Sequence, residues 1–175
     1  VNNCISQRLA VAKAKKDAQR FNLRRSAVAM VLDSDDFNQA SVLMIQRAVY
    51  EGDPWSGQMG FPGGRQESHD PSAVATAKRE MLEEIGLDVD EVNAATKPDG
   101  VIGRLSDINT SHRALGVDLV VSPYVFQVAE RPRLAPNGEV ADTVWIPLDF
   151  FADFRNRTTH ICLLYTSPSP RDGTK

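Results

Sequence analysis

GQMGFPGG at residues 57–64 and REMLEEIGL at residues 79–87 form the stretch from which the fold of this chain can be read. The first string predicts a short strand and a glycine turn, and the second lies near the end of a well-marked helix. Asp70 is a favourable N-cap, Pro71 suits the first helical position, and Gly86 suits a left-handed stop. We therefore expect about 15 residues of helix, roughly 22 Å long at about 1.5 Å per residue.

This helix has an apolar face and an acidic face. At about 100° per residue, Glu80, Glu83 and Glu84 fall within about 100° of one another. The opposite side carries a narrow apolar stripe with Leu82 at its edge, made of Val74, Ala77, Met81 and Ile85. Two carboxylates about 6 Å apart repel by roughly 2 to 3 kcal/mol at an effective dielectric near 20. Aligned beside a tight glycine turn, they favour a divalent cation, and oxygen ligands favour Mg²⁺ or Mn²⁺ over zinc.

An acidic helix face is more often a solvated surface than a metal site. The choice between the two depends on the complete sequence pattern from the glycine turn to the end of the helix. It resembles the Nudix box, a pattern of Gly, five residues, Glu, seven residues, then Arg-Glu-apolar-x-Glu-Glu-x-Gly-apolar. Residues 79–87 fit this pattern at every defined position. Counted from Gly64, the first half differs, because Asp70 replaces Glu and eight residues instead of seven precede Arg79. Asp70 therefore has two open roles, a salt link to Arg79 or a cap of the helix.

The resemblance implies which residues hold the metal. Glu80, Glu83 and Glu84 would bind Mg²⁺ (or Mn²⁺), which bridges the diphosphate oxygens of the substrate and offsets developing charge. A backbone carbonyl of Gly64 would be an additional ligand. One of the three glutamates, or a carboxylate from a loop, would orient the attacking water as general base.

The remaining candidate residues lie around those ligands. Arg79 would orient a carboxylate, and Gly63 with Gly64 would let the backbone approach the phosphates, since glycine has no Cβ to clash. Arg47 would meet a phosphate, and Glu139 lies in a loop where several Nudix enzymes place a base or an extra metal ligand. Two plain alternatives stay open: Arg47 as an ordinary charge at the end of a strand, and Glu139 as a solvated turn residue.

The flanks of the box indicate a substrate. Residues 43–47 (LMIQR) and 57–64 are similar to the extended motif of coenzyme A diphosphatases. That similarity implies hydrolysis of coenzyme A or an acyl-CoA to 3′,5′-ADP and 4′-phosphopantetheine. The intervening loop is one residue longer than in the motif, and Tyr50, Glu51 and Gly52 stand where its second Arg is expected. ADP-ribose, NADH and dinucleoside polyphosphates are the alternative substrates. A non-catalytic Nudix-fold nucleotide-binding regulator is the alternative function, disfavoured because all three box glutamates are retained.

The resemblance implies a small-molecule nucleotide as substrate, and composition bears on the other classes of partner. The chain has 175 residues, and 20 Lys and Arg against 23 Asp and Glu give no support to a surface that binds nucleic acid. No apolar run approaches the length of a membrane span. Cys4 and Cys162 indicate neither a disulfide framework nor a zinc site. No signal peptide is visible, so a cytoplasmic location is the expectation, and a homodimer stays open.

The rest of the chain predicts a mixed sheet packed by helices. We expect a surface helix at residues 6–20, a short helix at 147–154, and further strands at 26–32, 40–46, 100–105, 117–128 and 139–146. Loops are expected at 47–57 and 106–115, and a linker at 92–97. Pro123 interrupts the strand at 117–128, which indicates a bulge or an edge. The resemblance implies the Nudix fold, an α/β/α sandwich with a mixed sheet.

The two ends of the chain are expected to differ from its middle. Residues 1–22 would form a helical extension and residues 23–161 the Nudix hydrolase domain. Residues 162–175 resemble a translated sequencing adapter, with a natural Ser/Pro-rich tail as the alternative. If the adapter interpretation holds, the domain lacks its closing C-terminal helix. Residues beyond about 161 should then be extended or poorly packed, and one face of the sheet should expose apolar side chains.

Overall fold

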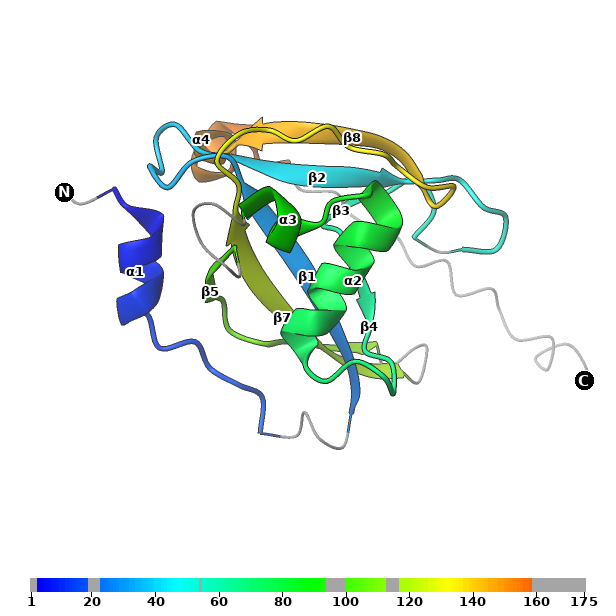
Figure 1. Ribbon diagram of the computed structural model, residues 1–175. Helices are drawn as coiled ribbons and strands as arrows, with labels where there is room; N and C mark the ends of the chain where they lie inside the picture. The colour runs from blue at the N-terminus through cyan, green and yellow to red at the C-terminus, as the bar shows by residue number, and fades with distance from the viewer. Residues whose placement is uncertain (1–2, 19–22, 54, 94–99, 113–116, 159–175) are drawn as a thin grey trace, which may run out of the picture.

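The computed structural model describes residues 3–18, 23–53, 55–93, 100–112 and 117–158 (Figure 1). Its helices are α1 (Ile5–Val11), α2 (Ala73–Ile85), α3 (Val89–Asn93) and α4 (Leu148–Ala152), and a 3₁₀ turn follows at Phe154–Asn156. Its strands are β1 (Arg24–Leu32), β2 (Ser41–Arg47), β3 (Met59–Gly60), β4 (Gly63–Arg65), β5 (Val101–Arg104), β6 (Ile108–His112), β7 (Val117–Gln127) and β8 (Val140–Pro147). The strands predicted from the sequence are confirmed, with bounds shifted by a residue or two.

The strands form one mixed sheet in which β1 and β7 are parallel neighbours and the other pairings are antiparallel. The parallel register is continuous from Arg24 opposite Leu119 to Leu32 opposite Gln127. Between β1 and β2, pairing among the described residues is confined to one residue pair at Leu32. The sheet therefore divides into two parts. Residues 59–65 cross from one part to the other, because β3 pairs with β2 and β4 pairs with β1.

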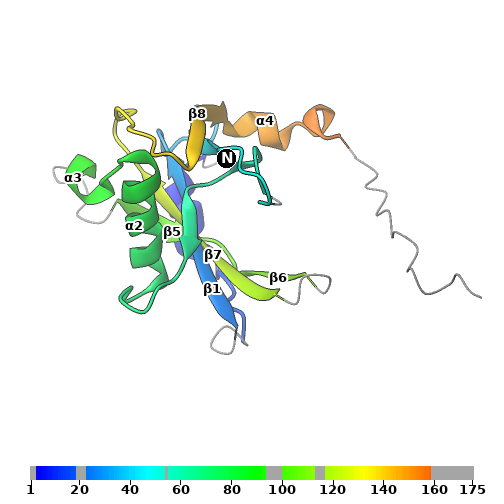
Figure 2. The same ribbon diagram turned by 90° about the vertical axis from the view of Figure 1, so that its right-hand side faces the viewer.

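Alternation along the strands places apolar side chains on both faces of the sheet. One face packs against α2, whose residues Ala77, Met81 and Ile85 are fully buried, whereas Leu82 is 51% exposed. The opposite face carries a smaller cluster covered in part by α1 and α4, formed by Leu32, Val42 and Val125 with Ile5, Leu9 and Leu148. Figure 2 shows α2 and α3 on one side of the sheet and α4 beyond the other. The predicted α/β sandwich is confirmed, and its second helical layer is the smaller one.

The end of α2 agrees with the sequence prediction and its beginning does not. Gly86 closes the helix in the left-handed conformation, with φ at 66°. At the start, Ser72 is the N-cap, and its hydroxyl accepts a hydrogen bond from the Ala75 N–H at 3.2 Å. The prediction that Asp70 caps the helix is therefore wrong, because its carboxylate is committed to other partners, described below. The helix has 13 residues, slightly fewer than expected.

The predicted helix at residues 6–20 is also too long. α1 ends at Val11, and residues 12–18 have no regular structure. They lie instead along the connection between β5 and β6. There the Lys15 N–H donates to the Ser106 hydroxyl at 3.0 Å, and the Lys15 carbonyl accepts from the Asp107 N–H at 2.9 Å. The weakly apolar stripe of this segment offers little burial, so these contacts with the loop take the place of helical hydrogen bonds.

Two segments predicted as irregular contain regular structure. The loop expected at 106–115 contains β6, which pairs with the first residues of β7. The linker expected at 92–97 overlaps the last residues of α3, and its remainder, 94–97, lies outside the described residues. Both elements are short, and neighbours supplied by the tertiary structure stabilise them more than local propensity does.

Pro123 lies inside the sheet, so the prediction of an edge is wrong. On one side of β7 lies β1, and on the other β6 pairs with residues 117–121 and β5 with residues 124–126. Pro123 falls at the junction of β5 and β6, where its carbonyl accepts from the Leu105 N–H at 3.1 Å. The N–H and C=O of one strand residue point to the same side, so the missing N–H faces this junction. Proline therefore interrupts no pairing there.

The second face of the sheet has partial cover. Large apolar side chains are exposed on β8, α4 and the 3₁₀ turn, at Val144 (40%), Phe150 (48%), Phe151 (43%) and Phe154 (76%). Among the described residues, which end at 158, no helix follows the 3₁₀ turn. The tail at 162–175 lies outside the described residues, so its adapter interpretation stays a prediction. None of the helices in the described ranges is long and apolar enough to cross a membrane.

The assignment of Ser72 as the cap gives a stability prediction. Ser72→Ala should lower the free energy of unfolding by about 1 kcal/mol, because the Ala75 N–H loses its acceptor. Urea unfolding followed by circular dichroism measures the change. Ser72→Asp is the matched control and should stay close to the parent protein, since aspartate also accepts at an N-cap. Equal stability of the alanine and aspartate variants would show that Ser72 does not cap α2.

Candidate active site

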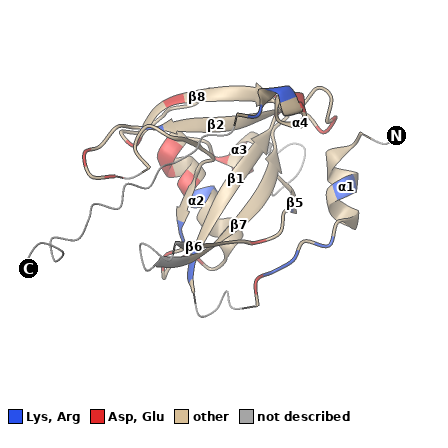
Figure 3. Cartoon of the chain, turned by 180° about the vertical axis from the view of Figure 1, so that it is seen from behind, with Lys and Arg blue, Asp and Glu red and all other residues tan. Residues whose placement is uncertain are grey.

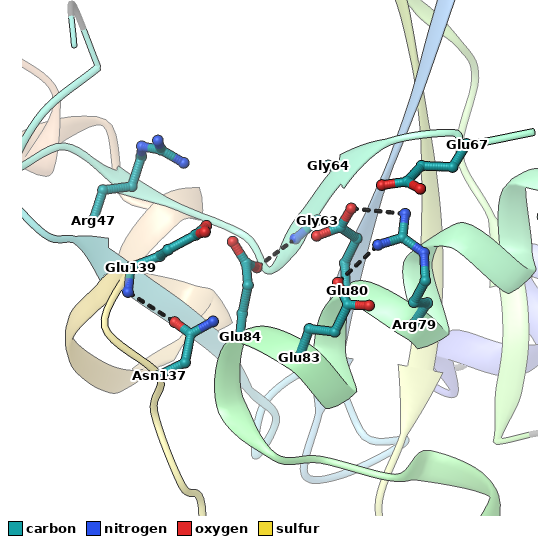
Figure 4. A pocket seen from close by; sticks show the side chains of 10 residues that line it. All are labelled: Arg47, Gly63, Gly64, Glu67, Arg79, Glu80, Glu83, Glu84, Asn137 and Glu139. Atoms are coloured by element: carbon teal, nitrogen blue, oxygen red, sulfur yellow. Dashed lines mark hydrogen bonds and ion pairs between the residues drawn. The ribbon is translucent and has the colours of Figure 1, made fainter. Parts of the chain in front are cut away.

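A pocket of about 320 Å³ lies where β2, β4, α2 and the segment before β8 meet (Figure 4). Negative charge dominates its lining, which consists of Arg47, Gly63, Gly64, Glu67, Arg79, Glu80, Glu83, Glu84, Asn137 and Glu139. Figure 3 shows acidic residues in the C-terminal part of α2. Every candidate site residue from the sequence lines the pocket, although they come from segments far apart in the chain. Their chemical roles stay predictions.

Two glycines bring the backbone of β4 against both the sheet and α2. Gly63 has φ at 154°, and a Cβ there would lie 2.7 Å from the Val28 Cα. A Cβ at Gly64 would lie 2.6 Å from the Glu80 Cδ. Real Cβ atoms do not approach this closely. A side chain at Gly63 would push β4 away from β1, whereas a side chain at Gly64 would displace the Glu80 carboxylate. The Gly64 carbonyl, predicted as a metal ligand, accepts a hydrogen bond from the Ser26 hydroxyl.

Arg79 is the centre of an ion-pair cluster on one side of the pocket. Its Nε donates to Asp70 Oδ1 at 3.1 Å, and a terminal nitrogen donates to the Arg65 carbonyl at 3.0 Å. Further ion pairs join it to Glu80 at 2.9 Å and Glu83 at 2.8 Å. The two open roles of Asp70 are thereby decided in favour of the salt link. A hydrogen bond from Arg79 holds the pKa of Asp70 well below its ordinary value, helped by the Glu67 N–H.

Glu84 occupies the buried end of the acidic face. Its carboxylate accepts a hydrogen bond from the Gly63 N–H at 2.9 Å. Burial raises the pKa of Glu84 to about 7, despite that hydrogen bond, and the negative charges of Glu80 and Glu139 act in the same direction. Burial likewise raises the pKa of Glu80, against the attraction of Arg79. The lining contains five glutamates and two arginines, so carboxyl groups outnumber the cations beside them.

The pocket has the donor chemistry for a hard cation, but its carboxylates are not gathered around one point. In the described part of the chain, no three carboxylate, imidazole or thiolate side chains lie close enough to hold an ion. Glu80 and Glu83 are turned to Arg79, and Glu84 to Gly63 (Figure 4). Asp70 and the Arg65 carbonyl would still hold Arg79 if Glu80 and Glu83 moved to a cation. The residues therefore fit Mg²⁺ or Mn²⁺ after a change of side-chain partners.

Arg47 lies on the opposite side of the pocket from Arg79. A terminal nitrogen of its guanidinium forms an ion pair with Asp53 at 2.9 Å, while its Nε is buried and lacks a hydrogen-bond partner among the described residues. A backbone hydrogen bond from Trp55 and the guanidinium of Arg47 lower the pKa of Asp53. An unsatisfied donor at the pocket wall is costly and suits an anionic ligand.

Glu139 reaches the pocket from the segment that precedes β8. Its side chain extends toward Glu84 in Figure 4, and its own N–H donates to the Asn137 side-chain oxygen at 2.8 Å. Sequence reasoning singled out neither Asn137 nor Glu67 as a site residue. An acidic residue soon after the glycine turn was the available signal for Glu67. No sequence signal pointed to Asn137, because its position depends on a hydrogen bond to the end of α2.

None of the histidine and tryptophan side chains that the structure describes lines the pocket. The side chain of His69 is 64% exposed beside Glu67, whereas His160 and the side chain of His112 are outside the described part of the chain. Trp145 packs against the core and carries the Arg131 guanidinium over its ring at 5.2 Å. Trp145 therefore packs against the hydrophobic core and does not reach the pocket.

Comparisons with known proteins agree with this architecture. Residues 23–164 match the family model of the NUDIX domain. Nudix hydrolase 15, mitochondrial, of Arabidopsis thaliana is 30% identical over 151 residues, which cover 85% of this chain and 48% of that protein. The chain spans about half the length of the curated relatives it matches.

Two solved structures share the fold at low sequence identity. The NUDIX domain of Shewanella oneidensis NrtR complexed with ADP-ribose has a TM-score of 0.54 at 21% identity, covering 84% of this chain and 85% of that one. A bifunctional NMN adenylyltransferase/ADP-ribose pyrophosphatase of Francisella tularensis, complexed with AMP and a manganese ion, has a TM-score of 0.53 at 20% identity. That match covers 82% of this chain and 38% of the other.

The ion pair of Asp70 predicts a pH-dependent contribution to stability. The folded-state pKa of Asp70 is lowered, so its stabilisation is fully present above the ordinary value near 4 and is lost as the pH falls toward the folded value. At pH 7, Asp70→Asn should lower the free energy of unfolding by about 3 kcal/mol, because Arg79 loses its buried partner.

Chemical denaturation between pH 7 and pH 3 measures this difference, which should shrink below pH 4. The matched control is Asp90→Asn, which breaks the exposed pair with Lys78 and should cost less than about 1 kcal/mol. A loss of stability in Asp70→Asn that is the same at every pH would contradict the role of the ion pair.

Proposed function

The chain belongs to the Nudix domain family, and from this premise we propose that it hydrolyses a diphosphate linkage in a nucleotide derivative with Mg²⁺ or Mn²⁺. One observation carries the proposal: Glu80, Glu83 and Glu84 face a pocket beside the Gly63 and Gly64 turn. An acidic pocket repels a diphosphate, so such a substrate enters favourably together with a divalent cation that both can share. Without a cation, the glutamates that line the pocket would repel one another and would also repel the diphosphate.

Glu80, Glu83 and Glu84 would hold the cation, and the Gly64 carbonyl would add a ligand beside its hydrogen bond from Ser26. When bound, the cation neutralises charge on the diphosphate oxygens and polarises the phosphorus that is attacked. Arg79 keeps Asp70 as partner throughout, so it stays near the glutamates and balances part of their charge. Because Gly63 and Gly64 have no Cβ, the phosphates would be able to approach the backbone of the turn closely.

The far wall of the pocket supplies the remaining groups. Arg47 would donate from its unpartnered Nε to a phosphate oxygen, while Asp53 keeps the rest of the guanidinium in place. Glu139 is exposed to solvent at the pocket rim and faces Glu84, where it would accept a proton from the attacking water. Hydrolysis then breaks one P–O bond of the diphosphate and leaves two phosphate monoesters.

For the substrate we propose coenzyme A or an acyl-CoA, cleaved to 3′,5′-ADP and 4′-phosphopantetheine. Its support is the similarity of residues 43–47 and 57–64 to the coenzyme A diphosphatase motif. ADP-ribose is the second candidate, favoured by the ligand of the NrtR domain, which shares the fold. A regulator that binds without hydrolysis is the less favoured function, because the three box glutamates are present and face one pocket.

Removal of a metal ligand should abolish turnover. Glu83→Gln and Glu84→Gln should each lower kcat by about 100-fold or more, since each removes a charged oxygen at nearly constant shape, about 2.7 kcal/mol of barrier. Release of phosphate monoesters in the presence of Mg²⁺ measures the effect, with circular dichroism as the check of folding. Glu91→Gln, an exposed change on α3, is the control and should keep full activity. Near-normal activity of both glutamine variants would rule out the metal assignment.

A substrate panel should distinguish the two candidates. The protein is incubated with Mg²⁺ and coenzyme A, ADP-ribose, NADH or a dinucleoside polyphosphate, and the products are separated by chromatography. We expect coenzyme A to have the highest kcat/KM and to yield 3′,5′-ADP and 4′-phosphopantetheine. A preference of about tenfold or more, or 1.4 kcal/mol, for ADP-ribose would instead assign the chain to another Nudix branch.

A further inference from the structure

The segment that carries Glu139 is attached to the C-terminal end of α2 by two backbone hydrogen bonds. The Ala135 N–H donates to the Ile85 carbonyl at 2.8 Å, and the Asn137 N–H donates to the Glu84 carbonyl at 2.9 Å. These carbonyls belong to the last turn of the helix, whose acceptors have no partner inside the helix. The segment thus caps α2 from outside, directly at the residue whose side chain lines the pocket.

Asn137 extends this attachment to Glu139 through its side chain. The Asn137 side-chain oxygen accepts from the Glu139 N–H at 2.8 Å, two residues along the chain, as in an Asx turn. One residue therefore links the backbone of Glu84 to the backbone of Glu139. The side chains of Glu84 and Glu139 both line the pocket, and the negative charge of Glu139 contributes to the raised pKa of Glu84.

A second attachment comes from the loop after β2. The Ala48 N–H donates to the Glu139 carbonyl at 2.8 Å, and the Tyr50 hydroxyl donates to the Gly138 carbonyl at 2.7 Å. Both contacts reach the peptide groups on either side of Glu139. The Tyr50 ring is itself 52% exposed, so burial does not explain its position, whereas the hydrogen bond from its hydroxyl does.

We propose that Asn137 is a positioning residue that fixes Glu139 relative to Glu84, with Tyr50 as a second, weaker positioning residue. The inference rests on the proposed function, in which Glu139 acts on the attacking water. An exposed glutamate on an unsupported turn would sample many positions, and a displacement of about 1 Å can lower a rate by about 100-fold. Hydrogen bonds at both ends of the Glu139 backbone restrain the turn and so narrow the positions that the side chain can reach.

The first test measures position without any activity. Amide hydrogen exchange followed by NMR should show that the Glu139 N–H exchanges about tenfold faster in Asn137→Ala, since its acceptor is gone. Asn137→Ser is the matched variant that keeps an acceptor at the same place, and it should retain most of the protection. Asn38→Ala, in an exposed loop, is the control and should change nothing at Glu139. Unchanged exchange in Asn137→Ala would overturn the proposal.

The second test is a double-mutant cycle in kcat with coenzyme A and Mg²⁺, or with the best substrate of the panel. Asn137→Ala should lower kcat by about 10- to 100-fold and change KM by less than about threefold, because positioning acts on the reacting geometry. Asn137→Ser should recover most of kcat, and Tyr50→Phe should lower it by about three- to tenfold. In a Glu139→Gln background, Asn137→Ala should add less than about twofold.

The two tests separate the inference from the function on which it rests. If the parent protein hydrolyses nothing in the panel, the proposed function fails, while hydrogen exchange still decides whether Asn137 orders Glu139. If the protein is active and Asn137→Ala keeps its full effect in the Glu139→Gln background, the two residues act independently and the inference fails. A parent-like rate of Asn137→Ala fails it as well.

Discussion

Close contact between the glycine turn and α2 is the constraint on which the rest of the structure depends. The positions that Cβ atoms would take at Gly63 and Gly64 are already filled by Val28 and by the Glu80 carboxylate. Without side chains there, β4 pairs edge to edge with β1, and the acidic face of α2 packs against β4. The Gly63 N–H can then reach Glu84. Arg79 reaches the same strand through the Arg65 carbonyl.

The same contact concentrates negative charge that the fold itself does not need. The buried Glu84 has a pKa raised to about 7, whereas the half-exposed Glu83 is paired with Arg79. An apolar face opposite these residues stabilises α2, and burial of Met81 and Ile85 contributes about 1.5 to 3 kcal/mol each. Packing on one face thus offsets repulsion on the other. A protein selected for stability alone would replace Glu84 with an uncharged residue, so its presence agrees with the proposed role of Glu84 as a metal ligand.

Sequence reasoning was most successful where one element carries the whole signal. The acidic face of α2, its apolar stripe and Gly86 follow from positions within a single helix, and the structure places all of them as expected. The cap at Ser72 and the role of Asn137 were missed because each depends on partners that only the folded chain supplies. Ser72 is the cap because Asp70 already binds Arg79, and Asn137 matters because its turn meets the end of α2. Sequence propensity indicates which residue types suit such positions. It does not show which of several hydrogen-bond partners a side chain takes in the folded chain.

The departure from the Nudix box at Asp70 shows which part of the motif tolerates change. One extra residue separates Asp70 from Arg79, yet their ion pair forms. Asp70 lies before the N-cap, so the loop between the glycine turn and α2 absorbs the extra residue. An extra residue between Arg79 and Glu84 would instead rotate all later side chains by about 100° and move Glu84 off the pocket face. The spacing of residues in the helical half of the motif is therefore strict. The half before the helix has to keep the ion pair between Asp70 and Arg79, but its length can vary.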